Sequence, residues 1–394
     1  MVRYNLDDVN EDMVLGESIF LQNGELLLAA GYKIKDEYIG LLKKRGIASV
    51  LIDVEGTESV VPETVISTHL QQSMAMSLSK METVFLDAFS VDLEGAGAID
   101  DFIKKNKHHL NKFLTSSQIG PKVEKMIQEI LNQPITIYNM AELMQAEAGL
   151  FYHAINVAVI SLCIGKKFHF SMEEMKQLGV GAMNYDLGMV AVPRKILEKK
   201  DELTKKELMA LRQHTVYGYL LLSQNPLIPA TSAAVALQHH ELQDGSGYPR
   251  GIKGANRPPH KDFSLKNTIH RFAEIVTVAE TYENLIAGRR HDSRVMSAPE
   301  AIKNMIELGG TKLNSIIVKA LVSIVPLYPT GARIRVTNAP ASNLIGYAGV
   351  IAKNDPARFN QPSIMLYESR NHRRIKPILV ETAKMPGVQF ELIL

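Results

Sequence analysis

The stretch ALQHHELQDGSGYPRG, residues 236–251, restricts the fold more than any other part of the sequence. An apolar run ends there in two adjacent histidines, His239 and His240, and a turn with three glycines follows. Glycine adopts backbone conformations that other residues avoid, so the chain is expected to turn tightly at this point. The pattern predicts a helix over 230–242 that brings both imidazoles to its end, beside a glycine-rich loop.

Helical signals dominate the sequence around this stretch, from about residue 135 to residue 324. Ser171 is followed three residues later by Glu174, and Thr204 by Glu207. Each pair is a capping box, in which two side chains satisfy backbone N–H groups at a helix start. The spacing therefore predicts one helix that runs toward residue 181 and a second that carries His214. Residues 265–287 are predicted to form a further helix, on which Glu280 and Glu283 are three residues apart and share one face.

Smaller modules are expected on both sides of the helical part. Residues 1–60 are predicted to form a ββαβ module, because Asn23-Gly24 between two apolar runs is a strong hairpin signal. Residues 61–134 are interpreted as a helical linker, which favours a homodimer, and residues 331–394 as short strands with glycine and proline between them. The predicted fold class is mainly α, with an all-helical core over 135–330.

Composition narrows the class of protein. The 394 residues carry a formal net charge of +2, without the basic excess of a dedicated nucleic-acid-binding protein. The longest apolar stretch, 154–165, is too short to cross a bilayer, and the first residues are acidic rather than those of a signal peptide. A single cysteine, Cys163, excludes an internal disulfide and a cysteine-rich zinc site. We expect a cytoplasmic protein of two or three domains, without nucleic-acid polymer as a partner and without membrane insertion.

The helical part also supplies metal-ligating side chains without any thiolate. They come from different expected helices or helix ends, and they are His153, Asp186, His214, His239, His240 and Glu280. Taken singly, each would be an ordinary polar residue on a helix surface. As a set, imidazole and carboxylate suit Fe, Mn or Zn at a hydrolytic site. A carboxylate that bridges two such ions can hold a water between them and lower its pKa toward ~7.

The segment HHELQDGSGYPRG closely resembles the second signature of the HD-GYP family, the metal-dependent phosphodiesterases of cyclic di-GMP signalling built on the helical HD-domain fold. The doubled histidine, the glutamate, Asp-Gly-x-Gly-Tyr-Pro and the following glycine are all present without a gap. The resemblance covers about residues 135–330. Its flanking landmarks are YHAINVAVIS, VAVPRKILEKKDELTKKE and AETYENLIAGRR.

The resemblance implies two metal positions. The second would be held by residues that are all present, namely Asp186, His214, His239 and His240. The first would take Asp186 as a bridge, together with His153, Glu280 in place of the usual aspartate, and the residue before Asp186. One or two divalent ions (Fe, Mn or Zn) are the implied cofactor, with Asp186 and Tyr185 at the reacting centre.

The first position departs from the family pattern. Tyr185 stands where the family has the histidine of its His-Asp pair, and Met189 replaces a lysine three residues after the aspartate. A phenol with a pKa near 10 must ionise to bind a metal well. Gly149 lacks the glutamate that some members use for a third ion. The departures therefore impair the first metal position and leave the second one complete.

The resemblance also implies where a substrate would lie. The loop residues Gly247, Tyr248 and Pro249, together with Arg289, are the expected substrate-binding residues, and Arg289 would reach a phosphate bidentately. The expected ligand is cyclic di-GMP or a related cyclic dinucleotide. The same loop is a candidate contact surface for a protein partner.

Two functions of different class stay open at this point. One is a cyclic di-GMP phosphodiesterase that is slow or depends on an unusual metal. The other is an inactive relative that binds metal, nucleotide or a partner such as a diguanylate cyclase, and signals without turnover. A different phosphoester substrate is a weaker third reading, because the HD superfamily includes nucleotide phosphohydrolases.

Overall fold

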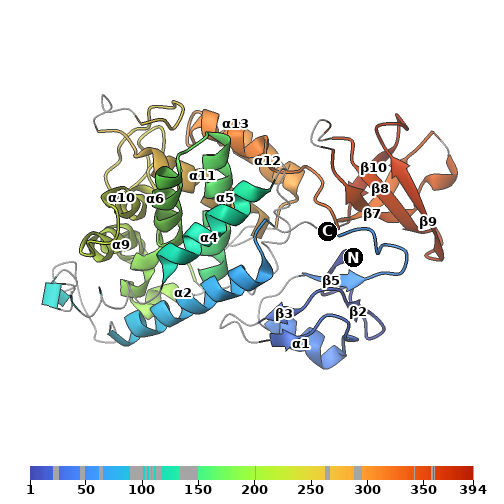
Figure 1. The fold of residues 1–394 in the computed structure, drawn as a ribbon, viewed down its shortest axis with the longest axis horizontal. Helices are drawn as coiled ribbons and strands as arrows, with labels where there is room; N and C mark the ends of the chain where they lie inside the picture. Colours follow the sequence, from blue (N-terminus) through green and yellow to red (C-terminus); the bar gives the residue numbers. More distant parts are fainter. Residues whose placement is uncertain are drawn as a thin grey trace.

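The computed structural model describes most of the chain. The described residues are 1–20, 26–44, 49–61, 65–88, 118–133, 150–199, 201–261, 267–287, 295–340, 342–355 and 360–393, with 101, 102, 104, 105, 108, 111 and 358. A helical body, a small N-terminal module and a C-terminal sheet can be followed in Figure 1. The fold is mainly α, as predicted. Among the described residues, no helix is both long and apolar enough to cross a membrane.

The N-terminal module contains the strands and the helix that the sequence predicts, and two further strands. Its elements are β1 (Val2–Asn5), β2 (Val14–Leu15), β3 (Ile19–Phe20), β4 (Leu26–Leu28), α1 (Asp36–Lys44) and β5 (Ser49–Asp53). β3 and β4 pair antiparallel as the expected hairpin, although its Asn23-Gly24 turn lies outside the described residues. β5 lies between β1 and β2, which the sequence did not predict.

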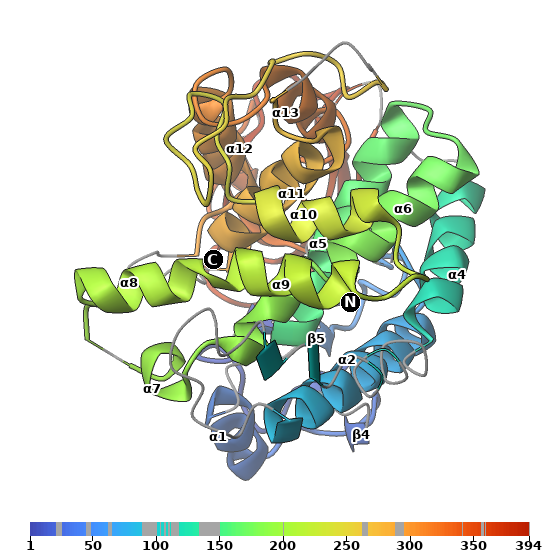
Figure 2. The same cartoon turned by 90° about the vertical axis from the view of Figure 1, so that its left-hand side faces the viewer.

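The helical body contains α2 and the helices from α4 to α13. Their bounds are α2 (Thr68–Ala88), α4 (Ile119–Asn132), α5 (Leu150–Lys167), α6 (Met172–Met183), η2 (Leu187–Ala191), α7 (Arg194–Leu197), α8 (Lys205–Arg212), α9 (His214–Ser223), α10 (Ala230–Gln238), α11 (Arg271–Ala287), α12 (Ala298–Leu308) and α13 (Ser315–Val322). Figure 2 shows α8, α9 and α10 on one face of this body. α5 runs behind them and is almost entirely buried over residues 153–165.

Both predicted capping boxes are confirmed. The Ser171 hydroxyl accepts from the Glu174 N–H while Glu174 accepts from the Ser171 N–H, and Thr204 and Glu207 do the same. These reciprocal bonds satisfy N–H groups that a helix start would otherwise leave unpaired. They fix the starts of α6 and α8, which flank the segment with Asp186.

Three helix bounds were predicted wrongly. The helix that begins after Thr204, α8, ends at Arg212, so His214 begins a separate helix, α9. α10 ends at Gln238 and not at residue 242, because the chain beyond it folds around the buried carboxylate of Glu241. α11 begins at Arg271 and not at residue 265. Residues 267–270 are not helical, since Asn267 has φ 55° and the His270 N–H donates to the Gln238 side chain at 2.6 Å.

The helices α2 and α4, which lie within residues 61–134, are packed into the helical body, although the sequence suggested a linker. Side chains of α2 and α4 belong to one apolar core with α5, α6 and α11. Val123 and Met126 of α4 are fully buried there. The Lys166 ammonium of α5 donates to the carbonyls of Ile130 and Gln133, which closes the end of α4.

The C-terminal strands form one antiparallel sheet in the order β10-β6-β7-β8-β9. Their bounds are β6 (Arg333–Asn338), β7 (Ala348–Lys353), β8 (Ser363–Glu368), β9 (Arg374–Glu381) and β10 (Gln389–Leu392), with a short 3₁₀ helix, η3 (Ser342–Leu344), before β7. This confirms the expected short strands. One face of the sheet is closed by an apolar cluster that includes Ile334, Ile351 and Ile364.

The N-terminal module packs against this C-terminal sheet, which the sequence did not predict. Val350 and Tyr367 of the sheet belong to the same apolar core as Val2, Tyr4 and other residues of the module. The Arg333 guanidinium lies 4.2 Å from the centre of the Tyr4 ring and pairs with Asp8 at 2.7 Å. The two modules therefore share one core beside the helical body (Figure 1).

Candidate metal centre

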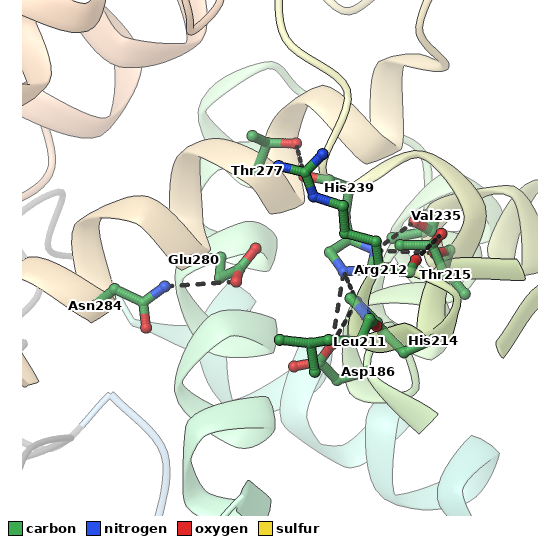
Figure 3. Close-up of polar contacts among 11 residues, drawn as sticks. Asp186, Leu211, Arg212, His214, Thr215, Val235, His239, Thr277, Glu280 and Asn284 are labelled. Carbon is green, nitrogen blue, oxygen red and sulfur yellow. Dashed lines mark hydrogen bonds and ion pairs between the residues drawn. The ribbon is translucent and has the colours of Figure 1, made fainter. Parts of the chain in front are cut away.

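Four of the predicted ligands meet at one point of the helical body. Asp186 precedes η2, His214 is the first residue of α9, and His239 and His240 directly follow α10. One ligand atom from each of these four side chains lies within 4.8 Å of the other three. Figure 3 shows Asp186, His214 and His239 converging from their separate elements. The sequence separates these residues by up to about fifty positions, and the packing of α9 against α10 and η2 brings them together.

The imidazoles of His214 and His239 are held in the tautomer that a metal requires. The Nδ1–H of His214 donates to the Leu211 carbonyl at 2.7 Å, and that of His239 donates to the Ala236 carbonyl at 2.9 Å. The Nε2 atoms lie 3.3 Å apart, and 3.4 Å and 3.5 Å from Asp186 Oδ1. A carbonyl partner on the outer nitrogen fixes the ring and leaves the inner lone pair for a metal.

Asp186 is the acidic centre of this group. Burial alone would raise the pKa of its carboxyl, but the contact with His239 and the nearby His214 and His240 hold that pKa well below its usual range. Among the described residues, no hydrogen-bond donor satisfies the buried Oδ1 atom. A buried anionic oxygen that faces three imidazoles is the donor set expected for a divalent cation, and the residues present therefore fit a metal ion.

Close backbone packing fixes the distance between Asp186 and His214. Gly188 of η2 lies directly against the start of α9. A Cβ atom on Gly188 would collide with the His214 carbonyl oxygen and with the Gly218 N–H nitrogen. Glycine at this position therefore allows η2 to approach α9 closely enough for Asp186 to reach the His214 ring.

The glycine-rich loop is attached to the metal-ligating group through His240 and Glu241. The Tyr248 ring stacks on the His240 ring, with centroids 4.6 Å apart and planes inclined by 28°. The Glu241 carboxylate is 1% exposed and accepts the backbone N–H groups of Arg250 and Ile252. A Cβ atom on Gly247 would meet the His240 carbonyl oxygen, so the loop can close here only through glycine.

A second buried network holds the outer part of the loop. Gln243 donates to Glu274 Oε1 at 2.5 Å, and Asn314 donates to Glu274 Oε2 at 3.3 Å. Gln243 also accepts the Asn256 N–H at 2.9 Å. Burial raises the pKa of Glu274 to about 7, which the two amide donors reduce only in part. The loop is thus anchored from inside by two carboxyl groups, Glu241 and Glu274.

The two other predicted ligands, His153 and Glu280, lie outside the group of four. His153 Nδ1 is 2.5 Å from Glu283 Oε2, and Asn156 donates to Glu283 Oε1 at 3.1 Å. Glu280 accepts from Asn284 at 3.4 Å (Figure 3). Burial raises the pKa of Glu280 to about 7, while the charges of His239 and His153 act to lower it. Both side chains therefore lie beside the group without joining it.

Sequence reasoning missed Glu283. Glu280 and Glu283 are three residues apart on α11, and their common face was predicted correctly. The spacing does not reveal that Glu283, which is 1% exposed, is the carboxylate that holds His153. A carboxylate that holds the outer nitrogen of a histidine commonly supports a metal ligand. The burial of Glu283 is therefore the one feature that would have pointed to this role.

Tyr185 lies between the group of four and His153. It is fully buried, its ring meets the His239 ring edge-on at 4.9 Å, and its centroid is 6.0 Å from that of His153. Met189 is half-buried on η2. The predicted phosphate ligand Arg289 lies outside the described residues, as does Gly149. Tyr185 is thus a packed aromatic ring at the residue where the family resemblance implies a histidine.

Residues 125–315 match the family described as the HD domain. The chain is 24% identical over 260 residues to a cyclic di-GMP phosphodiesterase of Pseudomonas aeruginosa, which covers 66% of this chain and 58% of that protein. It is 30% identical over 173 residues to a cyclic di-GMP phosphodiesterase of Thermotoga maritima, with 44% of each chain covered. The chain thus spans about half the length of these relatives.

A solved structure, Bd1817, an HDG"Y"P protein from Bdellovibrio bacteriovorus, aligns with 81% of this chain and 97% of its own. The TM-score is 0.40 and the sequence identity is 15%.

Proposed function

Because the chain belongs to the HD-GYP family of HD-domain proteins, we propose that it binds one divalent metal ion and, next to this ion, a cyclic dinucleotide. The ion would be held by Asp186, His214, His239 and His240. Nitrogen and carboxylate donors without thiolate suit Fe, Mn or Zn. The ligand would be cyclic di-GMP or a related cyclic dinucleotide, the substrate class in the names of the relatives.

The observation that carries this proposal is the unequal grouping of the donors. Four donor atoms lie within 4.8 Å of one another, whereas His153 and Glu280 lie outside this group. A four-donor site can hold one ion and leave coordination positions for water or a phosphate oxygen. When bound, such an ion polarises a phosphoryl oxygen and lowers the pKa of a coordinated water.

The residues of the chain would divide the work as follows. The carbonyls of Leu211 and Ala236 keep the two imidazoles oriented, and Asp186 supplies the negative charge that balances the cation. Tyr248 would offer its hydroxyl to the bound nucleotide, while its ring is held by the stack on His240. Signalling through binding is favoured over turnover, because Tyr185 and Met189 replace the imidazole and the ammonium of the first position.

Hydrolysis of the cyclic dinucleotide is the second candidate function. His153 favours it, because its ring is held by the Glu283 carboxylate, as is common for a metal-ligating histidine. A second ion would be held by His153, Glu280 and Asp186, and it would stabilise the charge that develops on the phosphoryl group. Without the imidazole at residue 185, we expect hydrolysis to be slower than in a two-ion enzyme by on the order of 100-fold or more.

The test combines metal analysis, binding and product analysis on the full chain. The protein is loaded with Fe(II) or Mn(II) without oxygen, and the metal content, the affinity for cyclic di-GMP and the linear products are measured. The matched variants are Asp186→Asn and the double variant His239→Ala, His240→Ala. We expect one ion per chain and nucleotide binding in the natural protein, with both lost in the variants.

Two results would change this assignment. If the natural protein hydrolyses cyclic di-GMP and the double variant does not, turnover replaces binding as the function. If the natural protein retains no metal after dialysis, or binds the nucleotide as well without metal as with it, the proposed site is wrong.

A further inference from the structure

Arg212 is an exposed cation that contacts the ring of Tyr248 in the glycine-rich loop. It is the last residue of α8 and lies two residues before His214. Its guanidinium carbon is 4.8 Å from the centre of the Tyr248 ring. Figure 3 draws the Arg212 side chain in one view with Asp186, His214 and His239. Within the described part of the chain, the guanidinium makes no ion pair.

The Tyr248 ring connects the Arg212 guanidinium to the metal-ligating group. Tyr248 stacks on His240, and Arg212 lies over the Tyr248 ring. The Tyr248 ring therefore contacts both the guanidinium and a candidate metal ligand. Burial raises the pKa of the Tyr248 hydroxyl, the charges of Glu280 and Asp186 raise it further, and the charge of Arg212 lowers it.

The main chain next to Arg212 is held firmly in place. The Thr215 hydroxyl donates to the Arg212 carbonyl at 3.1 Å, and the Gly188 contact fixes the His214 carbonyl that follows. The element that packs against α9 at this point is η2, which carries Met189. Met189 thus lies on η2, which packs against α9, and α9 begins two residues after Arg212.

We propose that Arg212 binds a phosphodiester group of the cyclic dinucleotide and supplies the cationic contact for which Met189 has no charge. This inference rests on the proposed function. A cyclic dinucleotide has two phosphodiester groups, so that one can face the metal while the other meets the guanidinium. Arginine suits this task, since its planar fork donates two parallel hydrogen bonds to phosphate oxygens and its face stacks on a tyrosine ring.

The main experiment is a calorimetric titration of metal-loaded full-length protein with cyclic di-GMP. Arg212→Gln is compared with Arg212→Lys and with the control Arg373→Gln, which removes an exposed charge from the turn between β8 and β9. Loss of a charge-assisted, bidentate contact is expected to weaken binding by about 10- to 100-fold. Arg212→Lys should fall between the natural protein and Arg212→Gln, and the control should bind as tightly as the natural protein.

Two further readouts separate a phosphate contact from a structural role. The metal content of Arg212→Gln is expected to equal that of the natural protein, since the guanidinium is not a ligand of the ion. Its affinity should also depend less steeply on salt concentration, because one cationic contact to phosphate is gone. Loss of metal in Arg212→Gln, or an unchanged salt dependence, would overturn the assignment of Arg212 to phosphate.

The failure of this inference can be distinguished from the failure of the proposed function. If the natural protein binds cyclic di-GMP and Arg212→Gln binds it equally well, the inference about Arg212 is wrong and the proposed function stands. If the metal-loaded natural protein binds no cyclic dinucleotide, the proposed function is wrong and the inference is overturned with it.

Discussion

The candidate ligands form two groups, which are supported in similar ways but differ in their donors. The first group is Asp186, His214, His239 and His240, and the second is His153 and Glu280. His214 and His239 are oriented by backbone carbonyls, and His153 is oriented by the Glu283 carboxylate. Each arrangement is a proper support for a metal-ligating histidine. Yet only the first group brings four donor atoms within 4.8 Å of one another, whereas His153 has the ring of Tyr185 as its neighbour. The comparison teaches that a supporting contact to a histidine does not by itself assemble a complete set of metal donors.

The largest expected effect comes from removing the Glu283 carboxylate, which holds His153. Glu283→Ala leaves the donors of His153 and Asn156 buried without their acceptor. We expect a loss of about 3–5 kcal/mol in the free energy of unfolding, as for other broken buried pairs. Denaturant unfolding measures this loss, and metal analysis of the folded variant should still give one ion per chain. A parallel loss of the ion would show that His153 belongs to the working metal site and would break the comparison.

Restoring the missing donors tests the same comparison from the other side. The double variant Tyr185→His, Met189→Lys supplies the imidazole and the ammonium together. We expect it to bind a second ion and to hydrolyse cyclic di-GMP about 100- to 1,000-fold faster than the natural protein, the scale of one preorganised group that stabilises developing charge. Product formation measures the gain, and each single variant is the control. If the double variant gains a second ion but no activity, donors alone do not explain the difference between the groups.

The loop beside the complete group is expected to respond to pH through Glu274. Its folded-state pKa is about 7 and its ordinary value is 4.5. The unfolded chain therefore releases this proton at lower pH than the folded chain, so stability is fully present below about pH 4.5 and declines as the pH rises to about 7. The change amounts to on the order of 3 kcal/mol. The free energies of unfolding at pH 5 and pH 8 should differ less in Glu274→Gln than in the natural protein. An unchanged pH difference would assign the decline to other groups.

A smaller effect is expected from the backbone contact that joins η2 to α9. Gly188→Ala forces a methyl group against the His214 carbonyl, so η2 must move away. Overpacking of this kind costs about 1–3 kcal/mol in the free energy of unfolding, and metal affinity should fall because Asp186 moves with η2. Gly120→Ala on α4 is the matched control, since nothing lies within 4 Å of its added Cβ atom. Equal metal affinity in the two variants would show that the close approach does not set the geometry of the complete group.

Local signals explain most of what the sequence predicts correctly. The capping boxes at Ser171 and Thr204 depend only on residues three positions apart, and both are present in the structure. The doubled histidine and the glycines indicate a loop beside a helix end, and the four ligands named from the family resemblance lie together. Such features survive folding because few distant residues compete with them.

Features that depend on distant partners were not predicted. α10 ends early because Glu241, a residue of the loop, turns inward and accepts N–H groups from further along the chain. The role of Glu283 depends on which of two acids on one face of α11 meets α5. An alternating strand pattern likewise shows that β7 and β8 have an apolar face, but not that the N-terminal module covers it. In each case the tertiary partner decides, and a single sequence does not name that partner.

The shared core of the two β-containing modules has a consequence for biosynthesis. Tyr4 and the other residues of the module are synthesised before the helical body, but Val350 and Tyr367, which complete their core, follow roughly 350 residues later. At a synthesis rate of ~5–20 residues per second, the first module waits on the order of tens of seconds for its partner. During that interval the helical body can close between them. The nascent N-terminal module is therefore expected to be the segment that most needs protection while the chain is being made.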